Sequence, residues 1–145
     1  MKTALYAGTF DPPTVGHINI IERAAPLFTL LIIGVADNSE KKGFLSKKER
    51  VERLKKALRK LSNVKVVSYS GLTWQFAKKQ KVDLLLRSLR VGDDNSMEFS
   101  LAAANREYSG LETLFLPADP ALSFVSSSLV REILSAGGNA DRYLA

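Results

Sequence analysis

The chain has 145 residues, 46% of them hydrophobic and 25% charged, which is enough for a single domain with a substantial core. It contains no cysteine, which excludes disulfides, thiolate zinc sites and cysteine nucleophiles. The formal net charge of +6 indicates polyanionic partners, either nucleic acid or small phosphorylated ligands. No apolar run is long enough to span a bilayer, and no signal-peptide core is present, so we expect a cytoplasmic protein without a membrane partner.

The first elements enclose an unusual loop. The apolar run over 2–7 predicts a buried strand, and apolar spacing over 16–27 predicts a helix. Between them the chain reads Gly8-Thr9-Phe10-Asp11-Pro12-Pro13-Thr14-Val15-Gly16-His17 and includes the only histidine. A glycine-containing loop that enters a helix presents unpaired N–H groups, which suits anions. The motif is neither the dinucleotide fingerprint nor the P-loop, so a plain turn explains it equally well at this stage.

The middle of the chain continues the alternation of strand and helix. The continuously apolar segment 30–36 predicts a strand covered on both faces, followed by a polar loop over 37–44. Ser46 and Glu49 form a capping box that starts a helix. The apolar positions of this helix share one face: Val51, Leu54, Ala57, Leu58 and Leu61.

The remaining segments follow the same pattern. We predict strands over 64–67, 82–86 and 113–116, helices over 72–80 and 94–107, and a last helix that begins near Ser127. No repeat, linker or low-complexity segment interrupts them. The sequence therefore predicts one α/β domain over residues 1–145, with a five-stranded, mostly parallel sheet flanked by helices.

Polar segments follow each predicted strand. Ligands of parallel α/β sheets bind beyond the carboxyl ends of the strands, so these segments should meet at one edge. Singly, a lysine pair is usually solvated and a serine run usually caps a helix, but their shared edge favours a phosphate-rich site. The segments are Thr9–His17, Lys41-Lys42, Gly71-Leu72-Thr73, Arg87-Ser88-Leu89-Arg90 and Ser123–Ser128.

Two groups of basic residues have different interpretations. The cations over 47–60 alternate with Glu49 and Glu52 and lack an aromatic platform, so we interpret them as mostly a solvated helix face and expect no nucleic-acid partner. Arg87 and Arg90 follow a buried strand, and their guanidinium groups suit phosphate oxygens. The alternative is that these two arginines only balance Asp93 and Asp94.

The motifs together resemble a known family. Gly8-Thr9-Phe10-Asp11-Pro12 and Thr14-Val15-Gly16-His17 resemble the signature of the nucleotidyltransferase superfamily in its T-x-G-H form. With the Lys41-Lys42 pair, Arg87-x-Leu89-Arg90, Glu98, Asn105-Arg106 and 124–131, nearly the whole chain resembles the bacterial-type phosphopantetheine adenylyltransferase family. Residues 88–97 depart from that family, which normally has an aromatic-rich run there.

The resemblance implies a Rossmann-like fold and a reaction. Members of the family transfer adenylate from ATP to 4′-phosphopantetheine and form dephospho-coenzyme A and pyrophosphate, a step of coenzyme A synthesis. Their reaction is an in-line attack without a covalent enzyme intermediate, and they are typically hexamers. We expect Mg²⁺ to enter with ATP, because the sequence shows no clustered carboxylates that would form a protein site for the ion. Phosphoryl-type transfer depends mainly on positioning and charge neutralisation, for which this residue inventory is suited.

The resemblance also implies roles for residues. The catalytic group would be His17, Thr9, Lys41 and Arg90. ATP would be bound by Thr9, Phe10, His17, Ser88, Leu89, Arg90, Glu98, Leu122, Ser123, Phe124, Val125, Ser126, Ser127 and Ser128. The acceptor would be bound by Thr9, Lys41, Thr73, Arg87, Asn105 and Glu132.

Two alternatives stay open from the sequence. A sister transferase would use another phosphorylated acceptor, such as nicotinamide mononucleotide or glycerol 3-phosphate. A non-catalytic protein would bind coenzyme A or nucleic acid without transferring adenylate. The Lys41-Lys42 pair and Arg87 oppose the sister transferase, which an acceptor screen tests. The non-catalytic protein is opposed by the joint presence of Thr9, His17, Lys41, Arg87 and Arg90, and salt-dependent retention on heparin without adenylate transfer would favour it.

Overall fold

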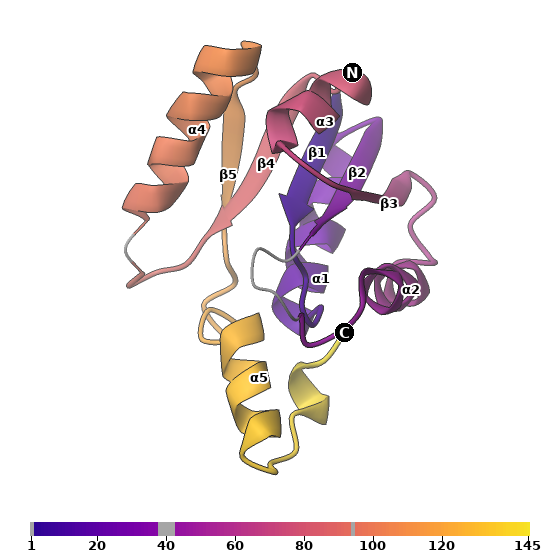
Figure 1. Ribbon diagram of the computed structural model, residues 1–145, viewed down its shortest axis with the longest axis vertical. Helices are drawn as coiled ribbons and strands as arrows, with labels where there is room; N and C mark the ends of the chain where they lie inside the picture. Colours follow the sequence, from indigo (N-terminus) through magenta and orange to yellow (C-terminus); the bar gives the residue numbers. More distant parts are fainter. Residues whose placement is uncertain (1, 38–42, 94) are drawn as a thin grey trace.

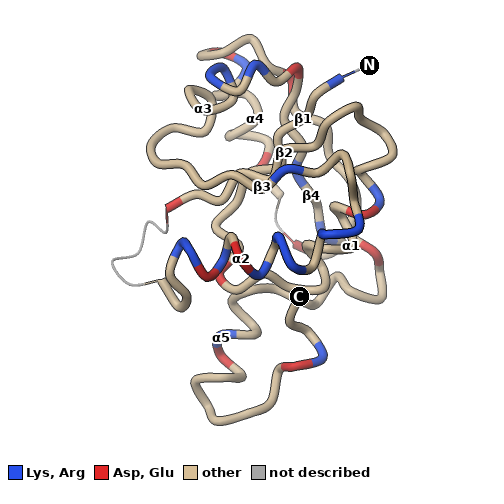
Figure 2. Tube along the Cα trace, turned by 90° about the vertical axis from the view of Figure 1, so that its right-hand side faces the viewer, with Lys and Arg blue, Asp and Glu red and all other residues tan. Residues whose placement is uncertain are grey.

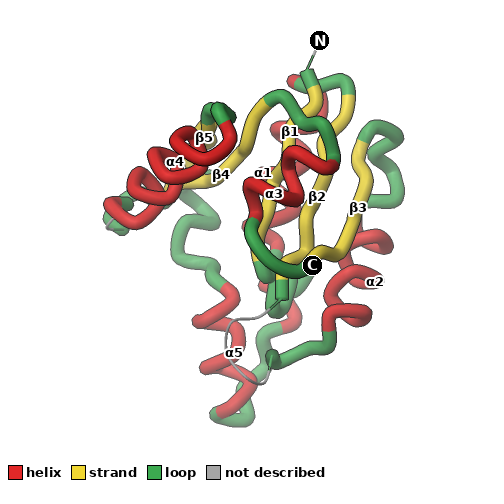
Figure 3. Tube along the Cα trace, turned by 45° about the horizontal axis from the view of Figure 1, so that its top comes forward, coloured by secondary structure: helices red, strands yellow, loops and turns green. Residues whose placement is uncertain are grey.

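A computed structural model describes residues 2–37, 43–93 and 95–145. Five parallel strands form one twisted sheet in the order β3-β2-β1-β4-β5. Figure 1 and Figure 3 show these strands side by side, with helices on both faces. The strands are β1 (Thr3–Gly8), β2 (Leu30–Ala36), β3 (Val64–Tyr69), β4 (Leu84–Leu89) and β5 (Thr113–Pro117).

The helices connect these strands in chain order. They are α1 (Val15–Ala24), α2 (Lys47–Ala57), α3 (Thr73–Lys79), α4 (Ser96–Ser109) and α5 (Ser127–Ser135). Two single turns of 3₁₀-helix complete the described elements, η1 (Ala25–Leu27) and η2 (Asp141–Tyr143). The connection that follows β3 returns to β4 on the other side of β1, so the strand order reverses between β1 and β4. This reversal marks the expected ligand-binding edge.

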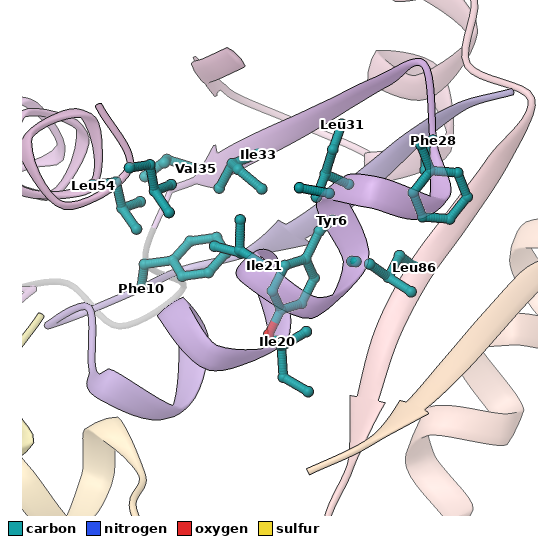
Figure 4. Close-up of a cluster of buried hydrophobic side chains, with 14 residues drawn as sticks. Tyr6, Phe10, Ile20, Ile21, Phe28, Leu31, Ile33, Val35, Leu54 and Leu86 are labelled. Carbon is teal, nitrogen blue, oxygen red and sulfur yellow. The ribbon is translucent and has the colours of Figure 1, made fainter. Parts of the chain in front are cut away.

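Alternate residues of the central strands face two separate cores. Tyr6, Ile33 and Leu86 point to the face covered by α1 and α2, and Figure 4 shows them packed with Ile21 and Leu54. The neighbouring residues point to the opposite face, where α3 covers them: Leu5, Ile32 and Leu85 pack with Phe76 and Ala77. Because both faces are buried, the strands read as continuous apolar runs, as the sequence predicted for 30–36.

Local signals explain where the first two helices begin. The side chains of Thr14 and Ser46 each accept a hydrogen bond from the backbone N–H three residues later. In turn, the side chains of His17 and Glu49 accept hydrogen bonds from the backbone N–H groups of Thr14 and Ser46. These are capping boxes, and the second confirms the prediction from Ser46 and Glu49. The predicted helix over 16–27 is shorter than expected, because Pro26 has no N–H to donate and the chain tightens into η1.

The predicted fourth strand was placed too early in the chain. Val82 donates its N–H to the Ala77 carbonyl, and Asp83 accepts a hydrogen bond from the Thr3 N–H, so neither residue is in the ladder. β4 instead covers Leu84–Leu89. Arg87, Ser88 and Leu89 therefore lie within the strand, although the sequence suggested that they follow it.

The other predicted elements are confirmed within a few residues. β2 has the predicted bounds, β3 extends to Tyr69, and β5 includes Pro117. The helix predicted over 94–107 begins at Ser96 and ends at Ser109, where Gly110 adopts a positive φ of 74° as a C-cap. α5 begins at Ser127, as predicted.

The centre of β2 requires a glycine. A Cβ built on Gly34 would lie 3.0 Å from side-chain atoms of both Leu5 and Tyr69 and 3.3 Å from Phe76. The rings of Tyr69 and Phe76 are stacked, with centroids 4.3 Å apart and an interplanar angle of 4°. A methyl group at this position would force that stack, and α3 with it, away from the sheet.

We therefore predict that Gly34→Ala lowers the free energy of unfolding by about 1–3 kcal/mol, the usual cost of overpacking a core. The matched control is Gly16→Ala, because a Cβ on Gly16 meets nothing closer than 3.4 Å. That variant should be neutral or slightly stabilising, since alanine restricts the unfolded chain. Urea denaturation measures both, and equal effects of the two substitutions would contradict the packing argument.

Candidate functional site

The loop after β1 is held by donors from distant elements. Arg50 of α2 is buried, and its Nη1 donates to the carbonyls of Thr9 (2.5 Å) and Ala36 (2.8 Å). This arginine thus joins the carboxyl ends of β1 and β2. The sequence interpretation of 47–60 as mostly a solvated face, which describes most of the cations along α2 in Figure 2, does not hold for Arg50. The available signal was its helical spacing from Leu54 and Leu58, which places it on the buried face.

Two side chains from α5 hold the next part of the same loop. Arg131 Nη1 donates to the Asp11 carbonyl at 2.6 Å, and Ser127 Oγ donates to the Pro12 carbonyl at 2.8 Å. The Asp11–Pro12 peptide bond is cis. Because these carbonyls are bonded from α5, the helix lies beyond the carboxyl ends of the strands, at the bottom of Figure 1.

The Asp11 carboxylate also has a structural role. Its two oxygens accept hydrogen bonds at 2.7 Å from the backbone N–H groups of Phe44 and Leu45. The carboxylate thereby ties the loop after β1 to the segment that enters α2. Lys41 and Lys42, predicted for this region, lie outside the described residues.

His17 is neutral and oriented by its neighbours. Its Nδ1 accepts the Thr14 backbone N–H at 3.0 Å, so the ring proton is on Nε2, the nitrogen that remains for a ligand. Burial, and then the positive charges of Arg90 and Arg87, lower the pKa of His17 from 6.5 to about 4. The ring edge also packs on Phe10, with centroids 4.9 Å apart. At neutral pH this histidine is therefore an uncharged hydrogen-bond donor.

A polar cavity of about 300 Å³ lies at the edge where the strand order reverses. It brings together eight of the predicted residues: Thr9, Phe10, His17, Arg87, Ser88, Arg90, Glu98 and Ser127. A neighbouring hollow of about 20 Å³ adds Leu122 and Val125 to His17, Ser88 and Arg90. The segments after β1, β4 and β5 thus meet, as the sequence predicted.

A second, larger cavity of about 490 Å³ lies between the sheet, α3 and α4. Its walls are mostly apolar and include the predicted residues Thr73 and Asn105. Trp74 and Tyr108 also line it, with their rings stacked at 5.7 Å, and the sequence analysis had not singled out either residue. The two cavities share one wall, formed by Ala7, Gly8, Thr9, Arg87 and Glu98.

Arg87 and Arg90 have different partners. Arg87 donates from Nε and Nη2 to the two oxygens of Glu98, at 2.8 and 2.6 Å, and from Nη1 to the Ala7 carbonyl. Hydrogen bonding to Glu98 raises the pKa of Arg87. Arg90 lies 3.5 Å from Asp93. Of the alternative that the two arginines balance Asp93 and Asp94, the structure shows the contact between Arg90 and Asp93. Arg87 pairs with Glu98 instead, and Asp94 lies outside the described residues.

Consecutive residues of β4 face opposite sides of the sheet, which places Ser88 away from Arg87. Ser88 and Tyr6 both line the polar cavity on the α1 side. Burial raises the pKa of Tyr6, so the phenol stays protonated. The placement of the two side chains on opposite faces follows from their position within β4, whereas the sequence predicted that both residues follow the strand.

The serine-rich segment before α5 contributes more to structure than to the cavities. Ser126 caps α5 through the Leu129 N–H, and Ser128 accepts a hydrogen bond from Arg131. Ser123 donates to the Pro120 carbonyl. Phe124 is exposed and packs edge-on against Tyr143.

Several predicted residues do not line the three cavities. Leu89 ends β4, and Glu132 is exposed on α5. The linings of these cavities also lack four residues of the serine-rich segment: Ser123, Phe124, Ser126 and Ser128. Among the described residues there is no group of three or more histidine or acidic side chains that could hold a metal ion. No helix in the described parts of the chain is both long and apolar enough to cross a membrane.

Comparisons with known proteins agree with this architecture. A crystal structure from Vibrio parahaemolyticus, provisionally assigned as a nicotinate-nucleotide adenylyltransferase, superimposes with a TM-score of 0.69 at 19% identity and covers 100% of this chain and 88% of that one. The lipopolysaccharide core biosynthesis protein from Thermoplasma volcanium GSS1 gives 0.57 at 18% identity, with 82% of this chain and 97% of that one covered. At these identities the likeness shows the fold alone, and the predicted Rossmann-like α/β class is confirmed.

Sequence comparison goes further. A phosphopantetheine adenylyltransferase from Christiangramia forsetii (strain DSM 17595 / CGMCC 1.15422 / KT0803) is 41% identical over 139 residues, which cover 96% of this chain and 92% of that protein. The cytidylyltransferase-like family model matches residues 5–133. The resemblance predicted from the motifs is therefore confirmed, and the chain belongs to the cytidylyltransferase-like family of nucleotidyltransferases, among its phosphopantetheine adenylyltransferases.

Proposed function

We propose that this chain, acting as a single domain over residues 1–145 in the cytoplasm, transfers adenylate from ATP to 4′-phosphopantetheine and releases dephospho-coenzyme A and pyrophosphate. The observation that carries the proposal is the pair of cavities that share a wall at Thr9 and Arg87. The polar cavity suits a nucleoside triphosphate, and the larger apolar cavity suits the pantetheine arm of the acceptor. The name of the 41% identical relative supports the same substrates.

The proposed reaction needs positioning more than proton transfer. A phosphate oxygen of the acceptor attacks the α-phosphorus of ATP, the bond to the β-phosphate oxygen breaks, and pyrophosphate leaves. Since the nucleophile is already an anion, no general base is required. The barrier is lowered by holding the two phosphates in line and by neutralising charge on the phosphoryl oxygens.

The described residues supply these two functions. Arg87 and the Thr9 hydroxyl would bind the acceptor phosphate at the shared wall. The family resemblance adds Lys41, which lies outside the described residues, as a further cation. The Nε2–H of His17 would donate to the ATP phosphates as negative charge develops on them, and Arg90 would neutralise that charge. A neutral histidine suits this role, because it donates a hydrogen bond without having to lose a proton.

Mg²⁺ would enter with ATP. The described residues include no cluster of three or more acidic or histidine side chains, and the ATP phosphates would hold the ion. Magnesium supplies charge neutralisation on those phosphates when bound. Asp11, the nearest carboxylate to the motif, is engaged by Phe44 and Leu45.

The reaction is tested by pyrophosphate release from Mg-ATP with and without 4′-phosphopantetheine. Release should depend on the acceptor, and both His17→Ala and His17→Asn should lower kcat by about 10²–10³-fold, typical of losing one transition-state donor. His17→Asn is the control for folding, because its amide oxygen can still accept the Thr14 N–H while the Nε2 donor is gone. Thermal melts should show a loss of stability only for His17→Ala.

Three results would contradict the proposal. Release without acceptor would indicate simple hydrolysis, and activity of His17→Asn within tenfold of wild type would remove the proposed role of Nε2. No release with this acceptor would make nicotinamide mononucleotide and glycerol 3-phosphate the next acceptors to test.

The protonation state of His17 can be measured directly, because it is the only histidine. We predict that NMR titration of the ring gives a pKa near 4 in the folded protein and about 6.5 in urea, with Nε2 protonated at pH 7. Because the unfolded chain binds this proton more tightly, His17 lowers the free energy of unfolding as the pH falls from about 6.5 towards 4. A folded-state pKa of 6 or above would refute the assignment.

We also propose that the chain associates with copies of itself, as its family resemblance to hexamers implies. No residue of α4 is buried, and its Phe99 is exposed without lining either cavity. Light scattering after size exclusion should give an oligomer for the wild type and a smaller species for Phe99→Glu. Leu27→Glu, an equally exposed position on η1, should leave the mass unchanged. A monomeric wild type would overturn this proposal.

A further inference from the structure

The larger cavity has two ends of different chemistry. Arg87 and Glu98 form one end, in the wall that this cavity shares with the polar one. Tyr108 lines the same cavity ten residues after Glu98 along α4, which is roughly 15 Å of helix. Leu85 and Thr113, a cross-strand pair near the amino ends of β4 and β5, also line it. The cavity therefore extends from the charged junction towards the amino ends of the strands.

An aromatic pair lies at this second end. Trp74 is in the first turn of α3 and Tyr108 in the last turn of α4, and their rings stack with centroids 5.7 Å apart and an interplanar angle of 12°. Lys78 Nζ lies 5.6 Å from the centroid of the Trp74 ring, in a cation–π contact. Tyr108 is 64% exposed, so the pair lies where the cavity meets the solvent. Contacts from two helices thus hold the indole ring in place before any ligand binds.

The cavity between these ends is apolar. Leu101 and Ala102 of α4 line it on one side and Leu5 of β1 on the other. Among the described residues that line it, only Arg87 and Glu98 carry charge. The cavity therefore suits a ligand that is anionic at the junction and uncharged at its distant end.

The proposed acceptor has this distribution of charge and a matching length. In 4′-phosphopantetheine, about thirteen bonds separate the phosphorus from the sulfur and span roughly 15 Å when extended, since three backbone bonds span roughly 3.5 Å. With the phosphate at Arg87, the arm can follow α4 as far as Tyr108. Its last segment, cysteamine, consists of two methylenes and a thiol, which pack favourably against aromatic rings.

We infer that Trp74 and Tyr108 bind the cysteamine end of the acceptor arm and select acceptors that carry it. The inference rests on the proposed function, since it assigns the acceptor phosphate to Arg87. The aromatic pair lies far from the phosphates that react. Its loss should therefore weaken acceptor binding and leave kcat and the KM for ATP within about twofold of wild type.

Paired changes in the protein and in the acceptor test this contact. 4′-Phosphopantothenamide ends in a primary amide and lacks the two methylenes and the thiol. With the wild type its kcat/KM should be about tenfold lower than that of 4′-phosphopantetheine, as expected for the loss of two buried methylenes. With the double variant Trp74→Ala/Tyr108→Ala the two acceptors should agree within about twofold, because the aromatic wall that separates them is gone. A tenfold difference that persists in this variant would overturn the inference, and so would equal values in the wild type.

Two further variants serve as controls. Trp74→Phe keeps an aromatic face towards the cavity and should retain most of the discrimination between the acceptors. Tyr143 is a matched aromatic residue, because it also packs against a second ring, that of Phe124, and lies 5.6 Å from a cation, Arg142, but it lines neither cavity. Tyr143→Ala should leave the discrimination at the wild-type value. Its loss in Tyr143→Ala would overturn the assignment to the aromatic pair.

A binding measurement separates failure of this inference from failure of the proposed reaction. Trp74 is the only tryptophan, so its fluorescence reports on this end of the cavity without turnover. Titration of the wild type in the absence of ATP should give a Kd for 4′-phosphopantetheine about tenfold below that for 4′-phosphopantothenamide, and Tyr108→Ala should narrow the difference. Equal Kd values in the wild type would overturn the inference even in an active enzyme. A tenfold difference would support it even if pyrophosphate release failed.

Discussion

The candidate site depends on backbone carbonyls at the carboxyl ends of the strands that accept hydrogen bonds from distant arginines. Just beyond the end of β1 and at the end of β2, the buried guanidinium of Arg50 donates to the Thr9 and Ala36 carbonyls. Arg131 does the same for Asp11 from α5. A buried carbonyl without a donor is costly, so the loop has its shape only when α2 and α5 are docked. The shape of the candidate site therefore depends on helix packing as well as on the sequence motif.

The charges of the site follow a consistent pattern. Arg87 and Arg90 each have an acidic partner, whereas His17 is held neutral by burial and by the two arginines. Permanent cations and a fixed N–H donor keep their state across the neutral pH range. This suits the proposed transfer, in which the nucleophile needs orientation and charge neutralisation rather than deprotonation.

Much of the fold could be predicted because its signals are local. Ser46 and Glu49 predicted the start of α2, and the continuous apolar run over 30–36 predicted β2. The error at 82–86 arose because Val82 and Asp83 resemble strand residues in the sequence. In the structure Val82 donates to the Ala77 carbonyl at the end of α3, and the Asp83 side chain accepts from the distant Thr3 N–H. The error at Arg50 has a related cause. A cation can be buried on an apolar helix face only where it donates hydrogen bonds to carbonyls, and here those carbonyls come from residues distant in the sequence.

The sequence alone determined the alternation of strands and helices, the family and the position of the candidate phosphate-binding motif, because each of these depends on neighbouring residues. Tertiary structure decided which groups meet. Only the pairing of β4 beside β1 brings Arg87 to Ala7, and only the docking of α4 gives it Glu98 as a partner. Arg87 is 80 positions from Ala7 and 11 positions from Glu98 in the sequence. Strand order and helix packing, rather than spacing along the chain, bring these residues into contact.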